Sequence, residues 1–385
     1  MSEWNADLVI DWLLEEGRLH DDFDDMVQAL GIRLADAGAP ICRLRIGMRT
    51  LHPLVTAVSS VWLRGHEEPQ ILYAAHGMEQ RSGYFGSPLE VISRTLQPYR
   101  MRLGGDLPDD AHDVLHELKA SGITDYYGFL MQFTGEKGAI LVANSDAPEG
   151  FSDSDIAKLE KLARPLAPVV EVYSQKLVTS AIAEAYLGTR TSKLVMDGQI
   201  TRGDIQAIDA AILVSDLRDW TGLNTRLKPE DAVATVNRYF ELVSEAVEAE
   251  GGEVLKFIGD GILAIFPGDQ DGGKTACNRA LSAACAAQEA QTEAGLSFGI
   301  GLHSGEVLYG NVGSKTRIDF TVLGQAVNVA ARIEGLCARL DIPILFSGDF
   351  ADRLDRPSRL VGTEILKGHA EPFAIYTTAP LPQKA

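Results

Sequence analysis

Two acidic residues, Asp216 and Asp260, stand where apolar runs of the chain end. Asp216 closes Ala211–Ser215, and Asp260 lies in a Gly-Asp-Gly tip between Val254–Ile258 and Ile262–Phe266. Such a tip is typical of a β-hairpin, and each aspartate alone suits a turn or a cap. If the two strands are neighbours, both carboxylates meet at one sheet edge and repel each other unless a cation lies between them. The pair therefore predicts a site for Mg²⁺ or Mn²⁺, and paired metals are the usual device for in-line phosphoryl displacement.

A lysine inside the first strand of this hairpin is the next candidate. Lys256 shares its face of the predicted strand with Val254 and Ile258, its period-two neighbours. Because an unpaired ammonium is costly to bury, Lys256 either extends to solvent or binds a partner.

A third set of polar residues follows nearer the C-terminus. Asn328 and Arg332 are four residues apart in the helix predicted over Gln325–Leu340, so they share one face. They suit a transition state with charge on phosphate oxygens and a ribose oxygen to position, although any polar helix face can carry such a pair. Lys367 precedes a glycine turn, and by itself it is interpreted as a solvated side chain.

The composition is that of an acidic globular protein. Net charge is −19 over 385 residues, from 35 basic and 54 acidic side chains, and 45% of the residues are hydrophobic. Such a surface repels nucleic-acid phosphate and anionic lipid, so we expect neither as a partner. No apolar run approaches the roughly 18 residues of a membrane span, and Met1–Asp7 is polar and acidic, unlike an export signal. The four cysteines are scattered with no CxxC pair, so the sequence predicts reduced thiols and a cytoplasmic protein.

The chain around the C-terminal candidates alternates strands and helices. Strands are predicted over Ala211–Ser215, the two halves of the hairpin, Ser297–His303 and Glu306–Val312. A short run follows over Ile318–Leu323, with further strands up to Thr378. Helices are predicted over Pro229–Glu250, Gly273–Ala294 and Gln325–Leu340. This βαββαβ-like order predicts an antiparallel sheet with helices on one face, in an α+β fold.

The N-terminal half has a different order of elements. Helices are predicted over Ala6–Leu14, Asp22–Ala37 and Asp153–Gln175, and strands over Ile41–Met48, Ser60–Leu63, Gln70–Ala74, Tyr126–Thr134 and Gly138–Asn144, with a loop-rich stretch at 77–109. In this pattern, and in the string Glu149-Gly-Phe-Ser-Asp before the last helix, residues 1–173 resemble a GAF domain. The GAF signature for cyclic nucleotides, an Asn-Lys…Phe…Asp-Glu set, is not visible in the sequence. The resemblance leaves two interpretations, a dimerisation module and a sensor of a small-molecule ligand.

Residues 174–208 are the predicted connector between the two halves. Helical periodicity continues up to Gly188, which breaks it. Pro165 and Pro168 predict an interruption of the helix upstream, because a proline removes a backbone donor and clashes with the preceding turn. Helices at such a position often pair between two copies of a chain, which would let one domain set the geometry of the other.

Three strings give the C-terminal candidates a known pattern. They are Ser-Asp216-Leu-Arg-Asp-Trp-Thr, Lys256-Phe-Ile-Gly-Asp260 and Asp319-Phe-Thr321-Val-Leu-Gly…Val-Asn328-Val-Ala-Ala-Arg332. By their order and spacing, residues 209–380 resemble the catalytic domain of class III nucleotidyl cyclases, which implies a ferredoxin-like βαββαβ fold. The string after the first aspartate and the Gln325-Ala326 pair depart from the family pattern, but neither departure removes a catalytic group.

The resemblance implies metal and transition-state roles for five of the matching residues. Asp216 and Asp260, helped by the backbone carbonyl of Leu217, would bind two divalent ions per site, Mg²⁺ or Mn²⁺. In the transition state Asn328 would orient the ribose and Arg332 would hold phosphate charge.

Three further matches concern the nucleotide. Lys367 matches the family lysine that holds the polyphosphate, and Lys256 and Thr321 fall at the two base-selecting positions. An ammonium can donate to N1 of adenine and a threonine hydroxyl can accept from its 6-amino group, whereas guanine has a proton on N1 and an oxygen at C6. Guanylyl enzymes of the family carry Glu and Cys at these positions, so ATP is the expected substrate.

The sequence therefore predicts an adenylate cyclase that converts ATP to 3′,5′-cyclic AMP and pyrophosphate, regulated by its N-terminal domain. The resemblance implies a head-to-tail homodimer with two shared sites, in which one chain brings Asp216 and Asp260 and its partner brings the nucleotide and transition-state residues. The alternatives are a guanylate cyclase and a nucleotide-sensing module without turnover. A diguanylate cyclase is disfavoured, because the hairpin tip reads Ile-Gly-Asp-Gly rather than Gly-Gly-Asp-Glu-Phe.

Overall fold

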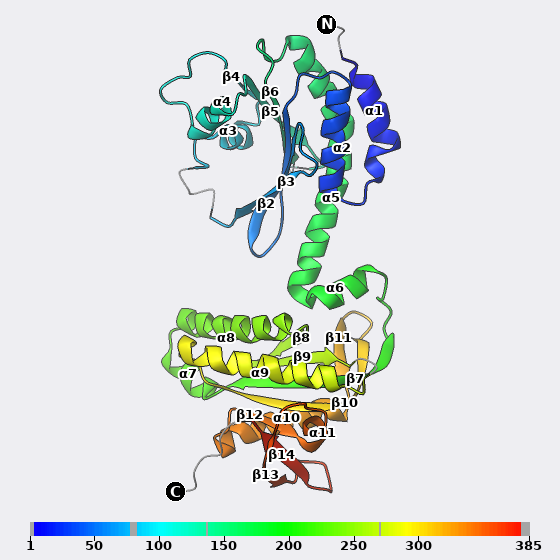
Figure 1. Cartoon of the computed structure of the whole chain (residues 1–385), viewed down its shortest axis with the longest axis vertical. Helices are drawn as coiled ribbons and strands as arrows, with labels where there is room; N and C mark the ends of the chain where they lie inside the picture. The colour runs from blue at the N-terminus through cyan, green and yellow to red at the C-terminus, as the bar shows by residue number, and fades with distance from the viewer. Residues whose placement is uncertain (1–3, 78–82, 136–137, 269–270, 379–385) are drawn as a thin grey trace. The chain divides into compact units, whose positions relative to one another are not determined.

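The computed structural model describes residues 4–77, 83–135, 138–268 and 271–378. The chain divides into two compact units, Met1–Ala185 and Tyr186–Ala385 (Figure 1). Each unit has its own sheet and its own hydrophobic core. The fold is therefore a mixed α+β chain with two sheets, as the sequence predicts.

The N-terminal unit is built on an antiparallel sheet of six strands in the order β3-β2-β1-β6-β5-β4. The strands are β1 (Arg43–Arg49), β2 (Val55–Leu63), β3 (Gln70–Ala75), β4 (Tyr99–Arg102), β5 (Asp125–Gln132) and β6 (Gly138–Ser145). The helices are α1 (Ala6–Glu15), α2 (Phe23–Asp36), α3 (Pro88–Thr95), α4 (Asp113–Ala120) and α5 (Asp153–Leu187), with a 3₁₀ turn at Gly17–Leu19.

The two faces of this sheet differ because side chains alternate along each strand. Leu44, Ile46 and Met48 of β1 are buried in a core formed with α1, α2 and α5. Arg43 and Arg45 alternate with them and extend toward the opposite face, on which α3 and α4 lie (Figure 1). One side of the sheet is therefore apolar, and the other side carries two cations beneath helices.

The stretch 77–109, predicted as loop, contains two elements that the sequence did not reveal. The helix α3 has eight residues and the strand β4 has four, which is too short for a periodic signal. A local signal for α3 was present, because Ser87 accepts a hydrogen bond from the Glu90 backbone N–H and Pro88 begins the helix.

The prediction that prolines interrupt the last helix of this unit was wrong. The helix α5 runs without a break through Pro165 and Pro168. Its apolar face, including Leu162, Leu166 and Val170, is buried in the core of the unit. Most helical stability in proteins comes from such packing, which here outweighs the missing backbone donors.

The C-terminal unit has a sheet of eight strands. The strands are β7 (Ile205–Leu217), β8 (Glu253–Ile258), β9 (Gly261–Pro267), β10 (Phe298–Gly313), β11 (Ile318–Leu323), β12 (Ile344–Ser347), β13 (Arg359–Glu364) and β14 (Phe373–Thr377). The helices are α6 (Thr189–Met196), α7 (Trp220–Arg226), α8 (Pro229–Ala249), α9 (Lys274–Ala294), α10 (Gln325–Leu340) and α11 (Gly348–Ala351).

The strand order is β13-β14-β12-β10-β7-β9-β8, with β11 paired to β10. The helices α8 and α9 pack on one face of the sheet, and α10 packs on the other face (Figure 1). The prediction of helices on one face alone was therefore wrong. A second difference is that β10 is a single strand where two were predicted, because Ser304 and Gly305 continue its pairing with β7.

A buried carboxylate joins α6 to this sheet. Glu253, at the start of β8, is 6% exposed and accepts hydrogen bonds from Thr191 Oγ1 at 2.6 Å and from the Tyr309 hydroxyl at 2.9 Å. Arg190 Nε lies 3.9 Å from Glu253 Oε2. The helix α6 is thereby fixed to the strand that carries Lys256.

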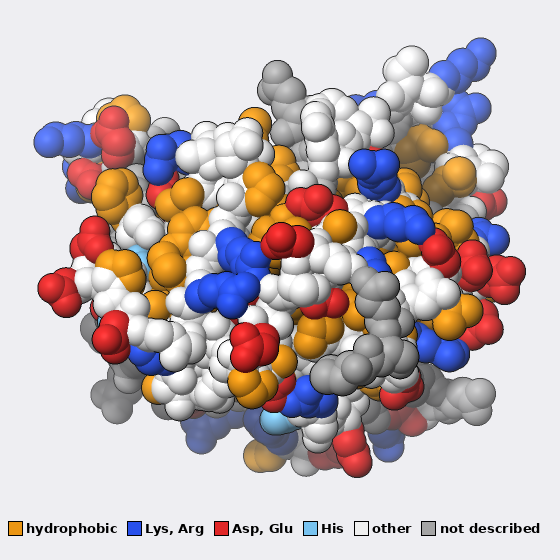
Figure 2. Space-filling view, turned by 90° about the horizontal axis from the view of Figure 1, so that it is seen from above, with side chains coloured by type: hydrophobic (Ala, Val, Ile, Leu, Met, Phe, Trp, Pro, Cys, Tyr) orange, Lys and Arg blue, Asp and Glu red, His pale blue; other side chains and the backbone are white. Residues whose placement is uncertain are grey.

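Among the described residues, no helix is both long and apolar enough to span a membrane. On the face drawn in Figure 2, acidic and basic side chains are distributed among apolar ones. The acidic excess of the composition is therefore not gathered into one area of that face.

Candidate active site

The structure brings Asp216 and Asp260 together at the ends of adjacent strands. The strands β7 and β9 pair antiparallel, and Asp216 lies opposite Gly261, the residue that follows Asp260. A Cβ at Gly261 would lie 3.3 Å from Asp216 Oδ1, so the glycine allows the carboxylate to lie close against the hairpin tip. We call Asp216 and Asp260 the acidic pair.

The two carboxylates of the acidic pair repel each other. Burial, and then the charge of Asp260, raise the pKa of Asp216 to about 6, while Arg218 opposes the shift. In the described part of the chain, no group of three or more His, Cys, Asp and Glu side chains is arranged to hold a metal ion. Mg²⁺ is usually bound by one or two carboxylates together with water and substrate phosphates. Two acids beside the backbone of Leu217 therefore fit such an ion.

Lys256 has a partner that the sequence analysis did not assign. Its Nζ lies 2.6 Å from Asp319 Oδ2 on β11. Thr321 follows two residues later on the same strand, so it belongs to the same face as Asp319. The structure thus places Lys256 against Asp319, two residues before Thr321 on the same strand. Asp319 stands in the string Arg-Ile-Asp-Phe-Thr, but nothing in that string indicates that this aspartate pairs with Lys256.

Asn328 and Arg332 lie on the side of α10 that faces away from the core. Asn328 is exposed and Arg332 half-buried, whereas Val329, Ala330 and Ile333 are buried. Neither side chain has a hydrogen bond or an ion pair with any residue that the structure describes. We call these two residues the α10 pair.

The loop that carries Lys367 lies next to the α10 pair. A Cβ at Gly368 would lie 3.7 Å from both terminal nitrogens of Arg332. Lys367 itself is exposed and directly precedes this glycine. Lys367 therefore lies on the loop that approaches the Arg332 guanidinium.

An ion pair behind the acidic pair was missed by the sequence analysis. Arg218 Nη1 lies 3.8 Å from Glu334 Oε1, and Glu334 is 8% exposed on the inner side of α10. Burial, followed by the charge of Asp216, raises the pKa of Glu334 to about 7. A glutamate that points inward from a helix has no sequence signal, because only the packing of α10 on the sheet buries it.

Residues 205–359 match the family model described as the adenylate and guanylate cyclase catalytic domain. This stretch of the C-terminal unit belongs to the cyclase family. An adenylate cyclase of Anabaena cylindrica is 38% identical over 184 residues, which are 43% of this chain and 36% of that protein. Adenylate cyclase 1 of Rhizobium meliloti (strain 1021) is 31% identical over 179 residues, 44% of this chain and 27% of that protein. The chain thus spans about a third of the length of these two relatives.

Solved structures of cyclases are also similar to the chain. The adenylyl cyclase CyaB from P. aeruginosa has 26% identity and a TM-score of 0.42, covering 47% of this chain and 98% of that one. The guanylyl cyclase Cya2 has 30% identity and a TM-score of 0.39, covering 48% of this chain and 96% of that one.

Within the cyclase domain the predicted site residues form three groups. The acidic pair lies beside Arg218, Lys256 lies beside Asp319, and the α10 pair lies beside the loop of Lys367. Across the described ranges, no hydrogen bond or ion pair joins the α10 pair to the acidic pair. One chain therefore holds all the predicted groups but does not bring all of them into contact.

Proposed function

We propose that the chain is an adenylate cyclase that converts ATP to 3′,5′-cyclic AMP and pyrophosphate. The observation that carries the proposal is the acidic pair, two mutually repelling carboxylates at adjacent strand ends of a cyclase catalytic domain. Adenylate cyclases among the relatives support the choice of reaction. The β10-β7-β9-β8 order supports a ferredoxin-like core.

Asp216, Asp260 and the carbonyl of Leu217 would hold the divalent ions. Two such ions, Mg²⁺ or Mn²⁺, would lower the pKa of the ribose 3′-hydroxyl and neutralise the triphosphate. Asn328 would orient the ribose, and Arg332 would hold the charge that develops on the phosphate oxygens.

The choice of ATP over GTP depends on Lys256 and Thr321. One of the three donors of the Lys256 ammonium is held by Asp319, which leaves donors for N1 of adenine. The Thr321 hydroxyl would accept from the 6-amino group. Lys367, beside Arg332, would bind the polyphosphate.

We propose that the active enzyme is a head-to-tail homodimer with shared sites. The support is that, among the described residues, no hydrogen bond or ion pair joins the acidic pair to the α10 pair, while Asn328 of the α10 pair is exposed. An Asp216→Ala chain mixed with an Asn328→Ala chain should regain activity, because one intact site forms in the mixed dimer. Each variant alone should be inactive, and no recovery in the mixture would contradict shared sites.

We propose three parts for the chain: a GAF-like domain at 1–173, a connector at 174–208 and the catalytic domain at 209–380. The six-stranded sheet between two helical layers supports the first part. The N-terminal domain would regulate the catalytic dimer through the connector. A 209–385 fragment should then differ from the full chain in activity, and equal activity under all conditions would contradict regulation.

The deciding experiment is an assay of the full chain with Mn²⁺ and either ATP or GTP. Cyclic AMP should form from ATP, and cyclic GMP should form much more slowly from GTP. Preferred formation of cyclic GMP would indicate a guanylate cyclase. Binding of ATP without any cyclic product would indicate a nucleotide-sensing module.

A further inference from the structure

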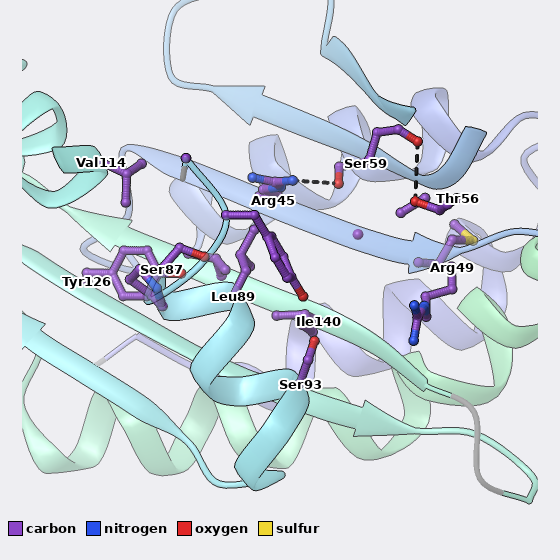
Figure 3. A pocket seen from close by; sticks show the side chains of 18 of the residues that line it. Arg45, Arg49, Thr56, Ser59, Ser87, Leu89, Ser93, Val114, Tyr126 and Ile140 are labelled. Carbon is purple, nitrogen blue, oxygen red and sulfur yellow. Dashed lines mark hydrogen bonds between the residues drawn. The ribbon is translucent and has the colours of Figure 1, made fainter. Parts of the chain in front are cut away.

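The N-terminal unit contains a cavity of about 570 Å³ between the sheet and its shorter helices. Figure 3 shows Arg45 and Ser59 on the sheet side, with Leu89 and Ser93 on α3 across from them. A cavity of this volume is within the range of small-molecule sites in proteins.

Two cations of this cavity lack an acidic partner. Arg43 Nη1 donates to Asn144 Oδ1 at 3.0 Å, and Arg45 Nη2 donates to Ser59 Oγ at 2.9 Å. The Nε of Arg45 is buried and donates to no residue that the structure describes. Over the same described residues, no Asp or Glu oxygen lies within 4 Å of either guanidinium.

Two guanidiniums held close together in an apolar place are costly. Burial, and then the neighbouring Arg45, lower the pKa of Arg43 to about 10. A buried cation is normally paired, because the loss of its hydration is not otherwise offset. A ligand with a negative charge would supply the missing partner, and a guanidinium can bind carboxylate or phosphate through two hydrogen bonds.

The rest of the lining is apolar with scattered hydroxyl groups. The apolar and aromatic members are Met48, Tyr84, Pro88, Leu89, Val114, Leu118, Tyr126, Ile140 and Val142, and the hydroxyl members are Thr56, Ser59, Ser87 and Ser93. This lining suits a molecule with an apolar body rather than a free inorganic ion.

We propose that this cavity binds a small organic anion, with its carboxylate or phosphate on Arg43 and Arg45 and its apolar body against α3 and α4. The proposal names the chemistry of the ligand for the N-terminal domain and is independent of the cyclase reaction, because it is tested by binding.

Two fluorescent probes that differ only in charge provide the test. The anion 8-anilinonaphthalene-1-sulfonate should bind the full chain at one site at least tenfold more tightly than the neutral N-phenyl-1-naphthylamine. Arg45→Gln should weaken binding of the anionic probe by at least tenfold and leave the neutral probe unchanged. Arg102→Gln, an exposed arginine of β4 outside the cavity, should change neither affinity. Equal affinities for the two probes, or an Arg45→Gln chain that binds the anion like the wild type, would overturn the proposal.

A melting curve separates binding from a structural role of the arginine. If Arg45 serves a ligand, Arg45→Gln should melt no lower than the wild type, because it removes an unpaired buried charge. A lower melting temperature with unchanged probe affinity would show a structural residue and overturn the proposal. Arg43→Gln gives a second, separate variant with the same expected loss of anion binding. Displacement of the anionic probe by octanoate, phenyl phosphate or inorganic phosphate then identifies the preferred anion, and displacement by inorganic phosphate alone would overturn the need for an apolar body.

Discussion

Both units bring like charges together, but with opposite signs and in different surroundings. In the N-terminal unit Arg43 and Arg45 line a cavity beneath two helices. In the C-terminal unit the acidic pair lies at strand ends, where one acid belongs to a turn. Guanidiniums in a cavity suit the binding of an organic molecule that displaces the water there. Acids at strand ends suit metal ions that bind together with a substrate. Repulsion between like charges therefore indicates an anionic ligand in the N-terminal unit and metal cations in the C-terminal unit.

Neutralising one member of the acidic pair should have the largest effect on activity. Asp216→Asn should lower cyclic AMP formation by about 10³-fold or more, because one of the two acids that we propose hold the cations is lost. The assay uses saturating Mn²⁺ and ATP. Asp219→Asn is the matched control, since Asp219 is an exposed acid paired with Arg226 at 2.7 Å. If the activity of Asp216→Asn stayed within tenfold of that of the control, the acidic pair would not have the catalytic role that we propose.

Removing the guanidinium of the α10 pair should have the next largest effect. Arg332→Ala should lower kcat by about 10²- to 10³-fold, because the proposed role of the group is to stabilise charge that develops in the transition state. Arg339→Ala on the same helix is the control, since Arg339 pairs with Glu364 at 2.7 Å. A change confined to KM would instead indicate that Arg332 binds substrate and transition state equally.

Exchanging the base-selecting residues should have a smaller effect. Lys256→Glu with Thr321→Cys should lower kcat/KM for ATP by about 10- to 100-fold, because the proposed donor to N1 and the proposed acceptor of the 6-amino group are both removed. The exposed Lys274→Glu change is the charge control. Unchanged kinetics with ATP would refute a role of these residues in reading the base.

The smallest expected effect is the contribution of the acidic pair to the pH dependence of the free energy of unfolding. The raised pKa of Asp216, about 6, means that the folded chain keeps this proton after the unfolded chain has released it. The free energy of unfolding should therefore fall as pH rises from 4 to 6, by on the order of 1 kcal/mol once screening by solvent is included.

Urea unfolding of two variants in EDTA isolates this contribution. Asp216→Asn and Asp219→Asn carry the same net charge, so their difference reports the acidic pair. Asp216→Asn should gain stability relative to Asp219→Asn between pH 4 and pH 7, and parallel curves would contradict the repulsion. Addition of Mg²⁺ should reduce the pH dependence of the wild-type chain, because the cation takes the place of the proton.

The sequence predicted the C-terminal unit better than the N-terminal one, for a physical reason. The long periodic segment Gln325–Leu340 has the predicted bounds, and the short run Ile318–Leu323 is the strand β11. The meeting of Asp216 with Asp260 was also predictable, because strand ends and turns have local signals. Asp319 as the partner of Lys256, and the Arg218–Glu334 pair, were not predictable, because each joins segments far apart in the sequence.

The cavity of the N-terminal unit could not be predicted at all. Arg43 and Arg45 alternate with Leu44 and Ile46, which is the pattern of a strand with one face in water. Only α3 and α4, two helices of eight residues each, turn that face into an interior. Alternating charged and apolar residues along a strand thus do not tell whether the charged face of the sheet is exposed to water or covered by helices.

The buried Glu253 has a mechanical consequence for the cyclase domain. Its two oxygens accept hydrogen bonds from Thr191 and Tyr309 at the start of β8. The other end of that strand leads into the turn that contains Asp260. A displacement of α6 would therefore act on the start of β8, whose six residues lead to the turn with the acid that we propose binds metal. Thr191→Val removes one of these hydrogen bonds. The variant should keep its basal turnover but lose the proposed regulation by the N-terminal domain. A Thr191→Val chain that is still regulated would show that the coupling follows another route.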